Sequence, residues 1–267
     1  MAASSLAASP LRRAHLNLLD SSRQFFELDP GAAIEAEPGW LFGAGSSSHP
    51  VISNGAFRRD DGVDAGEFVT RAKEFFAARE RGFSIWVRGG QAEDRDLIAA
   101  AETAGFQLVY EMPEMTLREK LEPAELPSGT ELRRLTKIEQ ATDFWRVAID
   151  SYESIGFPPE VFAGYTNYAG LLAENVVAFL ALLDDEPVGI AMTMVSHGVA
   201  GIYWVGSLER ARGKGIGRAV TVAATNAGFD LGANVASLQA SPMGKPIYLD
   251  LGYDAAFQYQ MWISPTP

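Results

Sequence analysis

The chain has 267 residues, which is long enough for two compact domains. Of these residues 47% are hydrophobic, which allows each domain a core, and 21% are charged, as in an ordinary soluble protein. Its net charge of −12 disfavours nucleic acid as a partner, and the lack of cysteine excludes disulfides, thiolate metal sites and a cysteine nucleophile. No apolar run is long enough to predict a membrane span and the N-terminus lacks a signal-peptide pattern, so we expect a cytoplasmic protein without a membrane partner.

The first 120 residues predict an alternation of helices and strands. The pattern at Phe68, Ala72, Phe75 and Phe76, for example, places apolar side chains on one face of a helix. Proline and glycine punctuate the segment after this series, which predicts a domain over 1–120 and a linker over 121–129. We expect helices over 11–28, 65–80 and 94–104, and strands over 32–37, 40–44, 51–57, 83–88 and 106–117.

A second series of elements predicts a domain over 130–267. It begins with a strand and two helices, and three strands then lead into a glycine-rich segment. A helix starts inside that segment, because apolar residues recur after it at helical spacing. We expect strands over 130–136, 176–183, 188–196, 200–206 and 235–240, and helices over 138–154, 160–173 and 247–251.

The glycine-rich segment, residues 207–218, has the features of a site for a diphosphate. It leads from a strand into the start of a helix, where backbone N–H groups and the helix dipole favour an anion. Glycine at 213, 215 and 217 lets the backbone approach closely, and four basic side chains lie nearby in the sequence. A dinucleotide fingerprint does not fit, because Arg218 stands where its third glycine belongs, and a P-loop does not fit, because Gly215 follows Lys214.

The remaining pattern, Arg212-x-x-Gly215-x-Gly217, resembles the coenzyme-A-binding motif of the GNAT (Gcn5-related) N-acetyltransferases. A second match follows, in which a strand, Ser241, and a short helix with Tyr248 before Gly252 resemble the family's later pattern. The family has asparagine where this chain has Ser241. The resemblance implies an α/β fold of two tandem GNAT-like domains, each with a mixed, mostly antiparallel sheet flanked by helices.

The same resemblance implies acetyl-CoA as the co-substrate and a direct transfer of its acetyl group to a primary amine. It implies that Tyr248 protonates the departing thiolate as the catalytic residue, and that the backbone before the glycine loop holds the pantetheine arm and supplies an oxyanion donor. The residues that it implies for cofactor binding are Val205, Ser207, Arg212, Gly213, Lys214, Gly215, Ile216, Gly217, Arg218 and Ser241.

An internal repeat relates the two halves of the chain. Residues 104–110 resemble 251–259, in each case after a strand and a helix. The first copy lacks the glycine motif and has Ala101 at the position of Tyr248, which indicates a degenerate acetyltransferase domain without a cofactor. An unrelated α+β domain with a similar ending is the alternative.

The acceptor and the general base are not identified by the sequence. Tyr152 and Glu153 end a helix beside the expected acceptor cleft, and the aromatic residues at 157, 162, 165 and 168 fit either its entrance or the core. The three histidines are too far apart in the sequence to predict a metal site. We expect a small-molecule or peptide amine as the acceptor and a monomer or homodimer, and a silent acyl-CoA-binding or regulatory protein is the alternative function.

Overall fold

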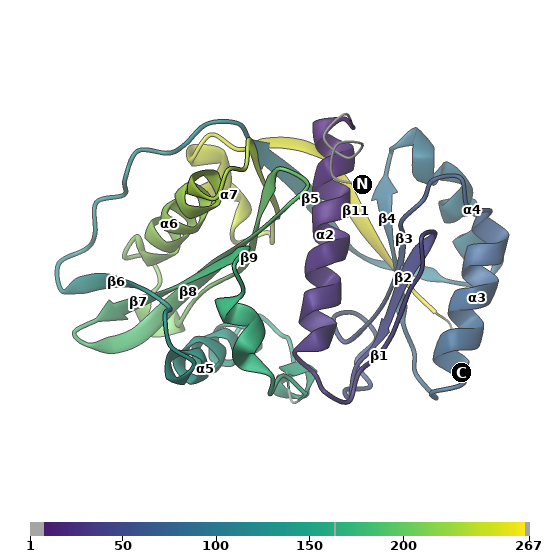
Figure 1. The fold of residues 1–267 in the computed structure, drawn as a ribbon, viewed down its shortest axis with the longest axis horizontal. Coiled ribbons are helices and arrows are strands. Elements are labelled where there is room, and N and C mark those ends of the chain that lie inside the picture. Colours follow the sequence, from purple (N-terminus) through teal and green to yellow (C-terminus); the bar gives the residue numbers. More distant parts are fainter. Residues whose placement is uncertain (1–7, 163, 265–267) are drawn as a thin grey trace.

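The computed structural model describes residues 8–162 and 164–264. Helices and strands alternate in two successive series, and both contribute to one extended sheet (Figure 1). The first series comprises α2 (Pro10–Glu27), β1 (Ala33–Ala36), β2 (Trp40–Ala44), β3 (Asn54–Arg58), α3 (Ala65–Ala77), β4 (Ser84–Gly89), η1 (Ala92–Asp94), α4 (Arg95–Thr103) and β5 (Gln107–Leu117). The second comprises β6 (Thr130–Arg134), α5 (Glu139–Glu153), η2 (Pro159–Phe162), η3 (Tyr168–Leu172), β7 (Val176–Leu183), β8 (Glu186–Ser196), β9 (Val199–Ser207), η4 (Glu209–Ala211), α6 (Ile216–Asp230), β10 (Val235–Gln239), α7 (Lys245–Asp250) and β11 (Asp254–Ile263).

The sheet has eleven strands within the described residues, in the order β1-β2-β3-β4-β11-β5-β10-β9-β8-β7-β6. Its neighbours are antiparallel except for β3 with β4 and β9 with β10, which are parallel. Parallel strands need a crossover connection, and α3 and α6 supply it in the two halves. The predicted fold class, two related α/β units with mostly antiparallel strands, is confirmed.

The two halves exchange their last strands. β5 pairs with β10 of the second series, whereas β11 pairs with β4 of the first. β5 and β11 also pair with each other, with Gln107 opposite Ile263 and Thr116 opposite Asp254. Because Gln107 and Asp254 begin equivalent strands, this register relates the halves by an approximate twofold axis. The boundaries at 120 and 130 therefore divide the sequence but not the sheet, and they stay a prediction about folding units.

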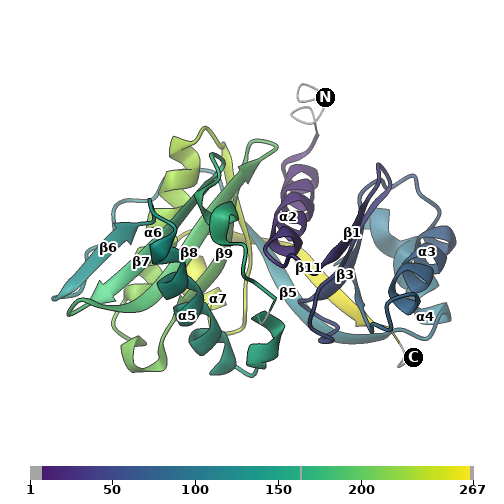
Figure 2. The same ribbon diagram turned by 60° about the horizontal axis from the view of Figure 1, so that its bottom comes forward.

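Helix α2 lies between the two halves (Figures 1 and 2). Pro10 occupies its first turn, where a missing N–H is harmless, and the Ser9 side chain accepts the Arg12 amide at 3.2 Å. The buried Asn17 side chain donates to the carbonyls of Met194 and Val199, at 3.0 and 3.2 Å. This helix of the first series is thus fixed to the sheet of the second.

One predicted helix is wrong. Residues 160–173 do not form a continuous helix: they contribute to two short 3₁₀ turns, η2 and η3, and residues 165–167 before η3 are not helical. The amides of Thr166 and Asn167 both donate to the carbonyl of Leu28 at 2.9 Å, and not to residues one turn earlier. Hydrogen bonds from these amides to the end of α2 therefore replace the bonds that they would donate within a helix.

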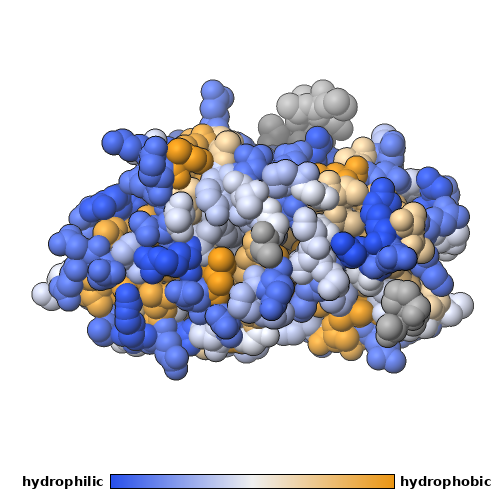
Figure 3. Space-filling model, turned by 90° about the horizontal axis from the view of Figure 1, so that it is seen from below, coloured by the Kyte–Doolittle hydropathy of each residue, from blue (hydrophilic) through white to orange (hydrophobic). Residues whose placement is uncertain are grey.

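Within residues 8–162 and 164–264, no helix combines the length and the apolar character that crossing a bilayer requires. The face in Figure 3 is covered mainly by hydrophilic and intermediate side chains, with apolar ones in separate patches. The largest apolar groups lie inside, in one core around α5 and α6 and a second around α3 and α4.

Candidate active site

The glycine loop between β9 and α6 presents backbone N–H groups to an open groove. Gly213 and Gly215 have φ angles of +74° and +84°, a region that side chains with a Cβ rarely adopt. The first hydrogen bond of α6 runs from the Ala219 amide to the Gly215 carbonyl at 3.0 Å, so the preceding amides of the first turn have no partner within the helix. A Cβ built on Gly213 would meet no described atom within 4 Å. The loop can therefore receive an anionic group from outside.

Strands β9 and β10 separate just before this loop. Their parallel pairing covers only Val199–Gly201 and Val235–Ser237, although both strands continue further. A bulge follows in β9, where the register against β8 shifts and Trp204 has a φ angle of +52°. A positive φ is strained for a bulky residue, and such bulges redirect side chains near functional sites. The separation opens the sheet at the point where the loop begins.

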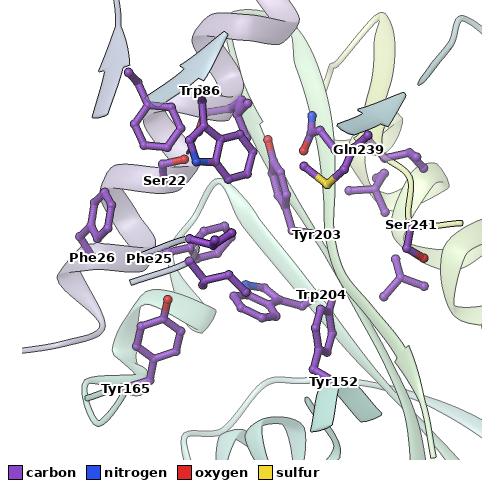
Figure 4. A pocket seen from close by; sticks show the side chains of 18 of the residues that line it. Ser22, Phe25, Phe26, Trp86, Tyr152, Tyr165, Tyr203, Trp204, Gln239 and Ser241 are labelled. Atoms are coloured by element: carbon purple, nitrogen blue, oxygen red, sulfur yellow. Dashed lines mark hydrogen bonds between the residues drawn. The ribbon is translucent and has the colours of Figure 1, made fainter. Parts of the chain in front are cut away.

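Two adjoining cavities occupy this opening. The first, the loop groove, has a volume of about 510 Å³ and is lined by the glycine loop, the ends of α5 and β9, and α7. The second, the aromatic cavity, has a volume of about 200 Å³ and lies between α2, β9 and β10 (Figure 4). Four residues line both cavities, and they mark the junction at which molecules bound on the two sides would meet: Tyr152, Val205, Ser241 and Tyr248.

Tyr248 projects from α7 into this junction. Its side chain is buried, and burial raises the pKa of its phenol above the ordinary value, with a further contribution from Tyr253. Burial also raises the pKa of Tyr152, and the neighbouring Tyr248 adds to that shift. Neither hydroxyl has a hydrogen-bond partner within the described residues. Both phenols stay protonated at neutral pH and can donate a proton or a hydrogen bond to a bound molecule.

Two arginines border the loop groove, each paired with another element. Arg212 donates to the carbonyl of Ser151 at 3.4 Å and to the Ser154 hydroxyl, which fixes it to the end of α5. Arg218 pairs with Asp250 of α7 across the groove, and both side chains are exposed. An anion that enters the groove would therefore meet Arg212, whose partners are neutral, and Arg218, whose partner is a carboxylate.

The first half of the chain supplies part of the aromatic cavity. Phe25 and Ser22 come from α2, Phe57 from β3 and Trp86 from β4. Phe25 packs edge-on against Tyr203 of β9, with a centroid distance of 5.5 Å. Strand exchange and the position of α2 thus bring both halves together at one cavity.

A buried carboxyl stands behind the cavity wall. Glu114 of β5 is completely buried, and it accepts hydrogen bonds from Ser237 and from the Gln239 amide, the latter at 2.7 Å. Gln239 itself lines the aromatic cavity. Burial raises the pKa of Glu114 to about 7, against the two hydrogen bonds, which lower it. The unfolded chain loses this proton at lower pH than the folded one, so Glu114 reduces stability as the pH rises from about 4.5 to 7.

His15 has the opposite effect on stability. Its Nε2 donates to the Arg58 carbonyl at 3.0 Å, so its Nδ1 accepts from the Tyr259 hydroxyl at 2.9 Å. Burial lowers the pKa of His15 to about 3, and nearby Arg88 lowers it further. The unfolded chain takes up a proton first as the pH falls, so the neutral form's stability is lost below about pH 6.5.

The structure brings most of the predicted site residues together. Nine of the ten predicted cofactor residues and Tyr248 line the loop groove, whereas Lys214 is exposed and does not. Of the acceptor candidates, Tyr152 lines both cavities and Tyr165 lines the aromatic cavity, but Glu153 lines neither. Phe162 packs in the core against Trp204, with a centroid distance of 5.5 Å. The roles of all these residues remain predictions.

The equivalent loop of the first half has a different chemistry. It joins β3 to α3, as the glycine loop joins β9 to α6. The Asp64 carboxylate caps α3 by accepting the Glu67 amide at 2.9 Å, and Asp61 accepts from Arg88 at 2.7 Å. Ala101, opposite Tyr248 in the repeat, is fully buried. The Asp64 carboxylate thus occupies the helix start that would otherwise attract a phosphate, and the nearby Asp61 adds a second negative charge to the same loop.

Comparisons with known proteins agree with this geometry. Residues 115–240 match the acetyltransferase (GNAT) domain family. No curated protein sequence matches the chain. Among solved structures, the chain resembles a GCN5-related N-acetyltransferase from Kribbella flavida, with 20% identity, a TM-score of 0.70 and coverage of 93% of this chain and 94% of the other.

Two further structures show the same fold. A GCN5-related N-acetyltransferase from Sphaerobacter thermophilus has 15% identity and a TM-score of 0.60, over 87% of this chain and 80% of the other. A tandem GNAT protein from the clavulanic acid biosynthesis pathway has 12% identity and a TM-score of 0.62, over 93% of this chain and 95% of the other. Residues 115–240 thus match the GNAT acetyltransferase domain family, and the two halves of the chain together have the fold of the tandem GNAT structure.

Proposed function

We propose that the protein transfers the acetyl group of acetyl-CoA to a primary amine. The observation that carries this proposal is the junction of the two cavities at Tyr152, Val205, Ser241 and Tyr248. The loop groove suits a diphosphate, and the aromatic cavity offers a separate space for a second molecule. A site of two compartments meeting at a proton donor fits the transfer of a group between two bound molecules.

The residues of the loop groove fit the cofactor. The first turn of α6 offers unpaired amides, and the space over Gly213 is open to a phosphate. Arg212 and Arg218 add two positive charges beside that space. When bound, acetyl-CoA would supply a thioester, whose carbonyl carbon reacts with a nucleophile and whose sulfur departs as a thiolate.

The chain's own residues would orient the reactants and move one proton. The opened end of β9 near Val205 offers backbone groups to the acyl oxygen, as an oxyanion donor requires. Tyr248 would give its proton to the sulfur, and the proton that the amine nitrogen loses on forming the amide would restore the phenol. For the neutral amine, a nitrogen–carbon bond forms, the carbon–sulfur bond breaks, and this step releases no net proton.

An amine panel with acetyl-CoA, followed by the release of thiol, tests this proposal. Turnover with at least one primary amine, dependent on Tyr248, is the expected result. The alternative, a protein that binds acyl-CoA without turnover, predicts saturable acetyl-CoA binding and no thiol release above the rate without amine. That second result would remove the proposed activity and keep the binding site.

A further inference from the structure

The walls of the aromatic cavity are mostly apolar. Aromatic rings from α2, α5, β4 and β9 surround it, and Phe25, Trp86, Tyr203 and Trp204 face it from different sides (Figure 4). Phe25 holds this arrangement through edge contacts to Tyr203 and Trp204, both with centroid distances of 5.5 Å. Such a lining favours an apolar, flat ligand, because burial of its surface is favourable and aromatic rings pack edge-on.

No charged side chain lines this cavity within the described residues. Its polar groups are single hydroxyl, indole and amide groups, and two of the hydroxyls already hydrogen-bond within the protein. The Ser22 hydroxyl donates to the Leu18 carbonyl at 2.7 Å, and the Ser241 hydroxyl accepts the Gly244 amide at 3.1 Å. A saccharide, a polyamine or a peptide chain carries more hydrogen-bonding groups than these partners can satisfy, and each group left unpaired lowers its affinity.

The volume of the cavity limits the size of its occupant. An apolar protein cavity of about 150 Å³ is known to hold benzene. The aromatic cavity, at about 200 Å³, therefore has room for one aromatic ring with a short chain. It is smaller than the pockets of about 300–1,000 Å³ that bind larger ligands.

Polar groups gather at the end that meets the loop groove. Tyr152, Ser241 and Tyr248 line both cavities and so mark that end. In Figure 4, Trp86 and Phe26 lie on the other side of the cavity from Tyr152 and Ser241. Gln239 also lines the cavity, and its amide nitrogen is bound to the buried Glu114 at 2.7 Å. Its amide oxygen is thereby left to accept a hydrogen bond from a ligand N–H.

We propose that the aromatic cavity holds the acyl acceptor, and that this acceptor is a small primary amine with one aromatic ring on a short alkyl chain. The inference deepens the proposed function and rests on it for the transfer step. The ring packs among Phe25, Trp86 and Tyr203, the amine points toward the junction, and Gln239 on the cavity wall accepts one of its N–H groups. The first half of the chain thus contributes substrate specificity although it lacks the glycine loop.

The aromatic walls also help to prepare the amine. Ring faces attract an ammonium group, so the cation can enter. Removal from water then lowers the pKa of the amine, since burial disfavours its charged form. The neutral amine that attacks the thioester forms after its extra proton has passed to water, and no acidic side chain is required in the cavity.

The test compares benzylamine and 2-phenylethylamine with spermidine and glucosamine as acceptors for the full chain. Ser22→Trp places an indole in the cavity, and Arg23→Trp places the same group on the exposed neighbouring position of α2 as a matched control. We expect the aromatic amines to have kcat/KM values at least about tenfold above the others. Ser22→Trp should lower these values at least about tenfold and leave the acetyl-CoA affinity unchanged, and Arg23→Trp should change neither more than about twofold.

A second variant guards against loss of folding. Phe25→Ala enlarges the cavity, so it should raise kcat/KM for 1-naphthylmethylamine relative to benzylamine. A preference for spermidine or glucosamine, or turnover of benzylamine that neither variant alters, would overturn the inference while the proposed function stands. If no amine is acetylated, the proposed function fails, and calorimetric binding of benzylamine decides the inference: binding abolished by Ser22→Trp supports it, and absent or insensitive binding refutes it.

Discussion

Gly215 offers the sharpest test of the glycine loop, because it combines an unusual backbone angle with a place in the groove. Its φ angle of +84° strains any other residue by about 1–2 kcal/mol. Gly215→Glu would add a carboxylate at the start of α6, beside the amides that the phosphates are expected to use. Loss of two charge-assisted hydrogen bonds, at roughly 1.5 kcal/mol each, would weaken acetyl-CoA binding about 100-fold.

The far end of the same helix provides the control. Gly232 follows the last turn of α6 with a φ angle of +92°, has no described atom within 4 Å of an added Cβ, and lines neither the loop groove nor the aromatic cavity. Gly232→Glu should therefore cost a similar amount of stability and leave acetyl-CoA affinity within about twofold of the wild type.

Titration calorimetry with acetyl-CoA, together with thermal unfolding of both variants, separates the two effects. We expect comparable losses of Tm and a loss of affinity in Gly215→Glu alone. Equal affinities in the two variants would show that the cofactor does not lie at the start of α6.

Four further predictions follow from the site. Tyr248→Phe should lower kcat about 100-fold without changing acetyl-CoA affinity. Tyr253 is a buried phenol that lines neither cavity, so Tyr253→Phe should leave kcat unchanged, and equal kcat values for the two variants would reduce Tyr248 to a packing role. Glu114→Gln should raise the free energy of unfolding above pH 7 by up to about 3 kcal/mol and leave it nearly unchanged below pH 4.5. Urea unfolding across that pH range measures this, and an equal loss of stability at every pH would contradict the raised pKa of Glu114. Asp250→Asn should release Arg218 and strengthen acetyl-CoA binding a few-fold, mostly at low salt, and weaker binding would count against competition between that carboxylate and the phosphates. Calorimetry should give one acetyl-CoA per chain, because carboxylates occupy the equivalent loop of the first half, and a stoichiometry of two would refute that reading.

The sequence predicted the glycine loop and its setting because the features involved are local. Strand, glycines and helix follow one another directly, and the positive φ angles at Gly213 and Gly215 explain why glycine occurs there. The repeat before β5 and β11 likewise indicated two related halves. Local pattern failed at 160–173, where the Leu28 carbonyl, distant in sequence, takes the amides of Thr166 and Asn167.

The aromatic cavity could not be predicted for a related reason. Its walls combine Phe25 and Trp86 of the first series with Trp204 and Gln239 of the second. Their meeting depends on strand exchange and on α2 crossing to the other half, and neither arrangement leaves a periodic signal in the sequence. Glu114 was missed as well, since the sequence does not distinguish this buried glutamate from Glu111 of the same strand or show what it bonds to.

Transfer of a labelled acetyl group is the most direct test of whether the protein acetylates an amine. The full chain would be incubated with acetyl-CoA labelled in its acetyl group and with 2-phenylethylamine, and the products separated by mass. We expect the label in the amide product, formed in equal amounts with free thiol and at a rate about 100-fold lower in Tyr248→Phe. Saturable acetyl-CoA binding with the label remaining on the thioester, across every amine offered, would contradict it.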